Sequence, residues 1–193
     1  EQKGTELYVN YMRRSDTGAI EIKNLLKSNK LNTSIKGVCW YSKGFIHNGS
    51  HFFNLLEFWL GSFVKFKVLA SGQFEDNVDP EPDVMVEFER GSVNFLSASG
   101  GGFAHWSLEL LSRSGRLRYE QGHVPLVWQP VVADPNFNGY KILRTVPRKI
   151  VTEMNHYQYN VFEQLAESFK GNDTTLCTGS QALVTLECMN KVI

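Results

Sequence analysis

The sequence predicts an α+β fold with a large, mainly antiparallel, open-faced sheet and helices on one face. Two observations lead to this prediction. Between Gly61 and Val132, short segments of alternating apolar and polar residues are separated by turns, as in an antiparallel meander. On either side of this region, apolar residues recur at helical spacing. With about seven strands and about four helices, one face of the sheet must meet water or a partner.

The composition is that of an ordinary globular protein. Of its 193 residues, 42% are hydrophobic and 21% are charged, which suffices for a core. Twenty basic residues balance twenty acidic ones, which argues against binding to nucleic acid or to an anionic membrane. No apolar run approaches the ~20 residues of a membrane-spanning helix. The three cysteines lack metal-binding spacing, so we expect reduced thiols in a cytoplasmic protein.

The chain begins with a strand, a turn and a helix. Leu7–Tyr11 reads as a strand, and the basic turn that follows ends in Ser15 and Asp16, either of which can cap a helix. Apolar residues from Ala19 to Leu26 then recur at helical spacing. The segment from Ser34 to Tyr41 is predicted to be the next strand, and its end is predicted to be buried.

The most informative stretch runs from Trp40 to Gly61. A polar turn with two glycines leads into a helix with one apolar stripe, which Gly61 terminates. We expect Asn48 or Ser50 to cap the start of this helix. The turn would gather polar side chains beside a helix N-terminus, where anions are favoured and protonated histidine is not. These side chains belong to Lys43, His47, Asn48, Ser50 and His51.

The meander after Gly61 has two interruptions. The loop of residues 75–82 is acidic and carries prolines, and the run of residues 97–102 is small and glycine-rich. No helix follows that glycine run, so a nucleotide-cradling role is disfavoured. The last strand, Val124–Val132, contains two prolines and is predicted to be an edge or bulged strand.

Two helices are predicted at the C-terminus. The first runs from Ile150 to Phe169 and is closed by Gly171. The second begins at Thr178–Gln181, which has the pattern of a capping box. Its apolar residues are Ala182, Leu186, Met189 and Ile193.

Residue spacing alone leaves the chemistry open. His47 and His51 lie one helical turn apart, which fits capping or solvent exposure, proton transfer by one of them, or a metal pair. Lys43 fits either an anion-binding residue or a solvated lysine. Arg13 and Arg14 fit either a clamp for a carboxylate or phosphate, or a solvated basic turn. His105, His123 and His156 are interpreted as structural.

The segment from Tyr41 to Leu56, Y-S-K-G-F-I-H-N-G-S-H-F-F-N-L-L, resembles the signature of the glucose–fructose oxidoreductase / inositol dehydrogenase family (Gfo/Idh/MocA). Upstream, Val9–Arg14 is similar to the strand that leaves the dinucleotide-binding domain in this family. The resemblance covers nearly the whole chain and is most specific between Lys43 and Leu56. Further segments occur in the order that the family's sheet requires, namely Phe88–Val93, Gly115–Arg118 and Gly139–Leu143.

The resemblance implies an enzyme in which one domain binds NAD or NADP and a second domain forms the substrate pocket. Neither the G-x-G-x-x-G fingerprint nor the family's Glu-Lys-Pro motif, which carries an active-site lysine, occurs in the chain. Residues 1–16 would then be the last strand and exit loop of a missing N-terminal dinucleotide-binding domain. Residues 17–193 would be the C-terminal substrate-binding and oligomerisation domain. We expect no cofactor site in this chain, which would be inactive alone.

The resemblance also assigns site residues. His51 matches the motif's histidine and would be the catalytic acid or base. The Asp that related members place four residues before it is His47 here, and the Asp three residues after it is Asn54, so an Asp–His relay does not carry over. No metal site is expected. The residues expected to bind substrate are Lys43, His47, Asn48 and Arg14.

The implied reaction is the oxidation or reduction of a secondary alcohol on a sugar, nucleotide-sugar or polyol. The alternative is a non-catalytic binding or assembly module that kept the open sheet. In either case, we expect a homodimer or homotetramer that hides the open face, on which Leu126 and Trp128 are expected to lie.

Overall fold

The structure is a computed structural model that describes residues 5–28, 34–72, 79–98, 103–120 and 126–193. Four α-helices, short helical turns and eleven strands follow one another along these residues. In order, they are β1 (Tyr8–Val9), η1 (Met12–Ser15), α1 (Thr17–Ser28), β2 (Ile35–Tyr41), η2 (Gly44–Gly49), α2 (Ser50–Leu60), β3 (Phe63–Ala70), β4 (Asp83–Phe88), β5 (Gly91–Ser97), β6 (Ser107–Ser112), β7 (Gly115–Glu120), β8 (Leu126–Ala133), β9 (Lys141–Leu143), β10 (Arg148–Ile150), η3 (Met154–His156), α3 (Tyr157–Phe169), β11 (Cys177–Thr178) and α4 (Gly179–Asn190).

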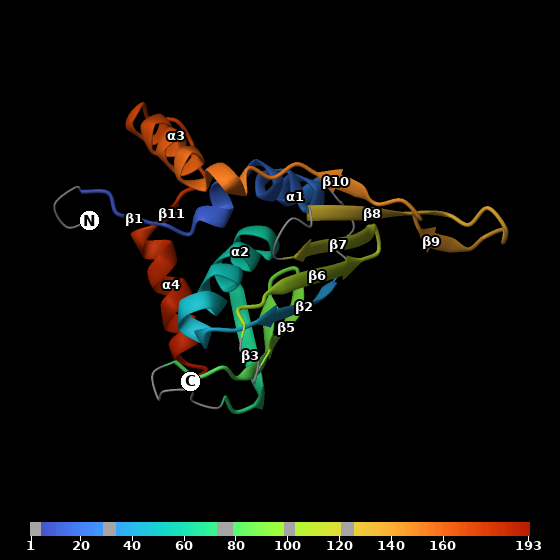
Figure 1. Cartoon of the computed structure of the whole chain (residues 1–193), viewed down its shortest axis with the longest axis horizontal. Coiled ribbons are helices and arrows are strands. Elements are labelled where there is room, and N and C mark those ends of the chain that lie inside the picture. Colours follow the sequence, from blue (N-terminus) through green and yellow to red (C-terminus); the bar gives the residue numbers. More distant parts are fainter. Residues whose placement is uncertain (1–4, 29–33, 73–78, 99–102, 121–125) are drawn as a thin grey trace.

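Nine of the strands form one sheet. Their order is β10-β8-β7-β6-β2-β5-β4-β3, and β9 pairs with the far end of β8. Every pairing is antiparallel except that of β2 with β5. The helices gather on one side of the sheet (Figure 1). The predicted α+β fold, with a mainly antiparallel open sheet and helices on one face, is therefore confirmed.

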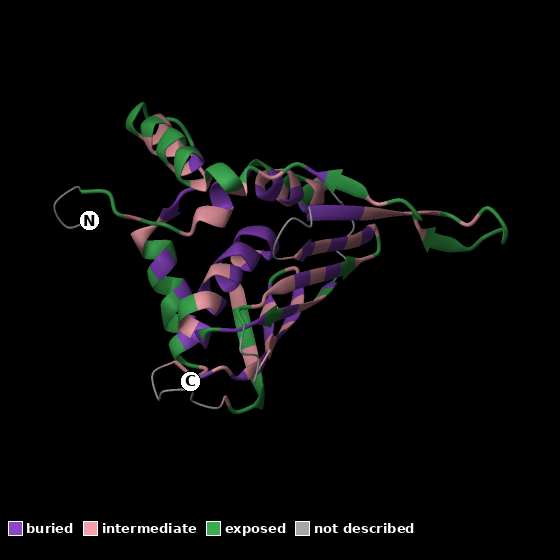
Figure 2. Cartoon of the chain, viewed as in Figure 1, coloured by how far each residue is buried: buried purple, intermediate pink, exposed green. Residues whose placement is uncertain are grey.

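The core lies between the sheet and α2. Strand residues alternate between the core and the open face, as in β4, where Val84, Val86 and Phe88 are buried. Nine of the eleven residues of α2 are buried, so the helix is enclosed beyond its predicted apolar stripe (Figure 2). Burying each large apolar side chain stabilises the fold by about 1.5–3 kcal/mol, and α2 contributes seven of them, namely Phe52, Phe53, Leu55, Leu56, Phe58, Trp59 and Leu60.

The N-terminal strand is shorter than predicted. Only Tyr8 and Val9 form β1, and they pair with Thr178 and Cys177 of β11. The Leu7 carbonyl also accepts a hydrogen bond from the amide of Gly179. As predicted, Asp16 caps α1, since its side chain accepts a hydrogen bond from the Ala19 amide at 3.3 Å. A second bond, from the Glu153 amide, joins this cap to the chain that leads into α3.

The structure differs from the predictions in β3, where alternation would put Val64, Phe66 and Val68 on one face, and in β8. The pairing of β3 with β4 shifts register between Phe63 and Lys65, so Phe63 and Phe66 pack on the core while Val64 is exposed. Strand β8 is not an edge strand over its first residues, because β7 and β10 flank it on both sides. The prediction for Val124–Val132 was wrong on this point, and residues 124 and 125 lie outside the described part.

The C-terminal helices differ from their predicted faces. Ile150 belongs to β10, and α3 is mostly exposed, with Phe169 at 79%. The capping box of Thr178 and Gln181 is present as predicted. The face of α4 that packs inward consists of Ala182, Thr185, Cys188 and Met189, rather than the predicted set that included Leu186 and Ile193.

All three cysteines are free and buried, as predicted for Cys39. Within the described ranges, none of the helices has the length and apolar character needed to cross a bilayer.

Candidate functional site

The turn between β2 and α2 has an unusual backbone. Lys43 adopts the left-handed conformation, with φ of 66°, and Gly44 follows with φ of 92°. A Cβ atom on Gly44 would lie 2.1 Å from a carboxylate oxygen of Asp79. The chain then forms a single π-helical turn, η2, before α2 begins at Ser50. Single π turns occur often at functional sites in proteins.

The start of η2 is capped by carboxylates from the acidic loop. The two oxygens of Asp79 accept hydrogen bonds from the amides of Ile46 and His47, at 2.9 and 2.7 Å. Glu81 accepts one from the Gly44 amide at 2.9 Å and another from the Ser97 hydroxyl. These carboxylates take the place that we expected a bound anion to occupy, and they complement the positive helix end.

The predicted cap at Asn48 or Ser50 is therefore wrong. The helical turn begins earlier, at Gly44, and neither side chain caps it. The side-chain amide of Asn48 instead donates a hydrogen bond to the Ser42 carbonyl at 2.8 Å. The Ser42 hydroxyl in turn accepts a hydrogen bond from the backbone amide of His105, two residues before β6. Asn48 thus helps to hold the turn against the sheet.

His51 lies in the first turn of α2 and is half-buried. Its ring packs edge-on against Tyr11, with 5.4 Å between the ring centroids. Its Nδ1 atom is buried and has no hydrogen-bond partner among the described residues. Burial, and then the charges of Arg13 and His47, lower the pKa of His51 to about 4. The ring is therefore neutral near pH 7, as predicted, but the main cause is burial rather than the helix end.

Arg13 supplies the positive charge next to His51. Its guanidinium lies 4.5 Å from the centroid of Phe52 and 5.2 Å from that of Trp106. Its Nε atom has no partner among the described residues, and no carboxylate is among the groups that shift its pKa. Burial lowers the pKa of Arg13, and an anionic group at this place would compensate its charge.

The other predicted site residues lie at different distances from this centre. Lys43 and His47 are exposed on the turn. Arg14 turns the other way, with its guanidinium 4.8 Å from the ring of Phe58. Phe52 and Phe58 are six residues apart on α2, about 9 Å along the helix. The structure therefore brings Arg13, rather than Arg14, next to His51.

The arrangement offers a proton acceptor beside a cation in a partly apolar setting. Over the described ranges, no group of three His, Cys, Asp or Glu side chains is placed to hold a metal ion. Three residues of this centre were not singled out as site residues in the sequence, namely Tyr11, Asp79 and Glu81. Burial raises the pKa of the Tyr11 hydroxyl, so it stays protonated and can donate a hydrogen bond.

Comparisons with known proteins identify the fold. No protein-family model matches the chain, and none of the curated proteins does. Among solved structures, the chain is similar to the aldose-aldose oxidoreductase from Caulobacter crescentus in complex with glycerol. The TM-score is 0.70 at 13% identity, over 99% of this chain and 62% of that one.

Two further solved structures have a similar fold. The WlbA dehydrogenase from Bordetella pertussis, in complex with NADH and UDP-GlcNAcA, matches with a TM-score of 0.68 at 12% identity, over 99% of this chain and 62% of that one. An oxidoreductase from Agrobacterium radiobacter in complex with NAD+, L-tartaric acid and magnesium matches with a TM-score of 0.61 at 15% identity, over 98% of this chain and 62% of that one.

The chain thus spans somewhat less than two thirds of the length of each of these proteins. Identities of this size establish the fold alone. These neighbours are oxidoreductases of the glucose–fructose oxidoreductase / inositol dehydrogenase type, so the fold that the sequence resemblance implied is confirmed. The chain has the fold of the part of these oxidoreductases that it covers.

Proposed function

We propose that this chain is the substrate-binding and oligomerisation portion of an NAD(P)-dependent oxidoreductase that acts on a secondary alcohol of a sugar, nucleotide-sugar or polyol. The observation that carries the proposal is the neutral, half-buried His51 next to the guanidinium of Arg13. The fold, shared with oxidoreductases whose complexes contain NAD+ or NADH, supports it.

In this proposal, His51 exchanges a proton with the reacting hydroxyl of the substrate. A neutral imidazole accepts that proton when the alcohol is oxidised and returns it in the reverse direction. The charge of Arg13 favours the alkoxide that develops as the proton leaves, and it disfavours a protonated His51. Tyr11 orients the His51 ring through their edge-on contact.

Three more residues shape the pocket. Asn48 ties the turn to Ser42 at the end of β2 and keeps His51 in place. Lys43 and His47, both exposed on the turn, contact polar or anionic parts of the substrate. Arg14 would bind the substrate farther from His51, because its side chain lies against Phe58.

The residues present do not fit a dinucleotide site. The sequence has no G-x-G-x-x-G loop. Within the described sheet, β2 and β5 form the one parallel pair, and the turn that leads from β2 into α2 is not such a loop. NAD or NADP would therefore be bound outside this chain, by an N-terminal domain of which residues 1–16 form the last strand and exit loop. Residues 17–193 would form the second domain.

The first test uses the chain as it stands. In calorimetric titrations, neither NAD(H) nor NADP(H) should bind at micromolar concentration. Micromolar binding would place the nucleotide site in this chain and contradict the assignment of residues 17–193 as a substrate domain.

The second test uses the longest open reading frame that encodes this sequence. Its product should reduce NAD+ or NADP+ with a sugar or polyol, and His51→Ala should lower kcat by ~10²–10⁴ with little change in cofactor affinity. His156→Ala, at an exposed position in η3, is the control. Full activity of His51→Ala would refute the role of His51. Ligand binding without turnover would favour the non-catalytic module.

A further inference from the structure

A second hollow lies away from His51, beside Phe58 near the C-terminal end of α2. It has a volume of about 410 Å³, and β1, η1, α1, α2 and the segment before α4 all contribute to its wall. Volumes of this size lie in the range of small-molecule sites. Its polar wall includes Tyr8, Arg14, Lys23, Thr175 and Gln181, with the ring of Phe58.

Two cations face this hollow across one aromatic ring. The Nζ atom of Lys23 lies 3.5 Å from the ring centroid of Phe58, and the Cζ atom of Arg14 lies 4.8 Å from it. Arg14 is only 8% exposed, and its Nε atom has no hydrogen-bond partner among the described residues. Its NH1 group donates to the side-chain oxygen of Gln181, which fixes the plane of the guanidinium.

The electrostatic environment of Lys23 is positive. Burial, and then the charges of Lys27, Arg14 and Arg90, lower the pKa of Lys23 to about 8. The positive end of α4 adds to this field, since its N-cap residue Thr178 and Gln181 in its first turn also line the hollow.

The acidic groups of the hollow are peripheral. Glu6 and Asp173 line it, but both are exposed. The side chain of Glu6 accepts a hydrogen bond from the Tyr8 hydroxyl. Glu57 also acts on Arg14, but it does not line the hollow, and its carboxylate accepts a hydrogen bond from Thr185 of α4. Lys23 and Arg14 are the two cations that contact the ring of Phe58 in the hollow.

We propose that this hollow binds the phosphate group of a small molecule between Lys23 and Arg14. A phosphate carries the two charges that two cations can compensate, and a guanidinium fixed in its plane can bind two of its oxygens. The ring of Phe58 and the body of Tyr8 offer contact for the apolar part of such a molecule. The site is separate from His51 and does not depend on the proposed reaction.

The test is a calorimetric titration of the chain with inorganic phosphate at constant ionic strength. We expect saturable binding, which Lys23→Gln weakens by about tenfold or more because it removes one of the two charges. Lys27→Gln removes the same charge one turn along α1, where the side chain is exposed and does not line the hollow. It should change the dissociation constant by no more than about twofold. Thermal unfolding checks that both variants fold.

Other probes distinguish the source of the phosphate. Glycerol 3-phosphate that binds more tightly than inorganic phosphate would identify a phosphorylated small molecule, and equal affinities would identify free phosphate. Acetate, with one charge, should bind more weakly than either. The proposal is overturned by the absence of saturable phosphate binding, by unchanged binding to Lys23→Gln, or by equal losses in both lysine variants. His51→Ala should leave phosphate binding unchanged, so this result is independent of the proposed function.

Discussion

At the scale of single residues, His51 couples the proposed chemistry to stability. Its pKa of about 4 lies below the ordinary value of 6.5, because burial and the charge of Arg13 disfavour the protonated ring. The unfolded chain therefore binds a proton at a higher pH than the folded chain does. The stability that the neutral ring contributes is complete above pH 6.5 and is lost as the pH falls from 6.5 towards 4.

This effect can be measured. Each pKa unit corresponds to about 1.4 kcal/mol, so the unfolding free energy should fall by at most about 2 kcal/mol between pH 7 and pH 5 through His51. Urea unfolding at both pH values should show a smaller loss in His51→Gln than in the wild type. His156→Gln, at an exposed position, is the control. Equal pH dependence in the wild type and His51→Gln would contradict the neutral ring.

Gly44 is a second residue on which the site depends. Gly44→Ala would place a Cβ atom 2.1 Å from the Asp79 carboxylate, at a φ of 92° that alanine rarely adopts. We expect this variant to lose about 2–4 kcal/mol of unfolding free energy. Gly139→Ala is a matched control, because its φ is 83° but no atom lies within 4 Å of the added Cβ. It should lose only about 1 kcal/mol. Equal losses would mean that the contact with Asp79 is unimportant.

At the scale of elements, the acidic loop and the turn before α2 form one unit. Asp79→Ala removes the acceptor of two helix-end amides, so we expect it to cost about 1–3 kcal/mol in urea unfolding. Glu87→Ala is the comparison, since it breaks only the exposed ion pair with Lys65, for which less than about 1 kcal/mol is expected. A smaller cost for Asp79→Ala than for Glu87→Ala would show that the loop does not support the turn.

The elements that were predicted well are those defined by local patterns. The apolar stripe of α2, its end at Gly61 and the capping box of α4 each depend on residues within one or two turns. The alternation in β4 and β5 likewise predicted which side chains are buried. Local periodicity was sufficient for these elements, but not for α3 and α4, whose apolar residues are largely exposed.

The contacts that were missed join distant segments. Nothing in the spacing of the sequence connects Asp79 with Ile46, because 32 residues lie between them and the loop has no regular period. The choice between Arg13 and Arg14 depends on which way a short 3₁₀ turn directs each side chain, and neighbouring residues look alike in sequence. The register shift in β3 likewise changed which residues face the core, since it places Phe63 rather than Val64 on the same side as Phe66.

At the scale of the whole molecule, the open face of the sheet differs from the prediction. Leu126 and Trp128 are buried on the helix side, so they cannot form a subunit contact. Trp40 and Leu111 are exposed instead, at 42% and 45%. A shallow hollow of about 290 Å³ lies next to Leu111 on the same face.

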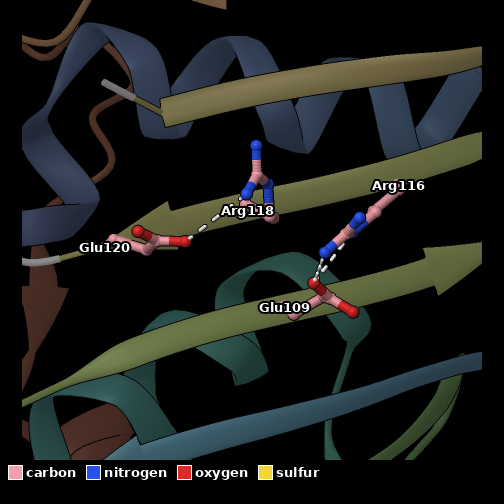
Figure 3. A network of polar contacts seen from close by, with 4 residues as sticks. All are labelled: Glu109, Arg116, Arg118 and Glu120. Atoms are coloured by element: carbon pink, nitrogen blue, oxygen red, sulfur yellow. Dashed lines mark hydrogen bonds and ion pairs between the residues drawn. The ribbon is translucent and has the colours of Figure 1, made fainter. Parts of the chain in front are cut away.

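Ion pairs border this apolar area. Arg116 is paired with Glu109, and Arg118 with Glu120, along the neighbouring strands β6 and β7 (Figure 3). Paired charges around a small apolar centre are the usual composition of a subunit contact. We therefore place the proposed contact of a homodimer or homotetramer on the face that carries Trp40 and Leu111.

Leu111→Asp tests this placement. The new carboxylate would stand opposite Lys36 and Arg116 in the sheet, so the fold should tolerate it while the apolar contact is lost. Light scattering at micromolar concentration should give a dimer or tetramer for the wild type and a monomer for Leu111→Asp. Leu183→Asp, at an exposed position of α4 on the helix side, should assemble like the wild type. A monomeric wild type, or an assembly that survives Leu111→Asp but not Leu183→Asp, would place the contact elsewhere or exclude it.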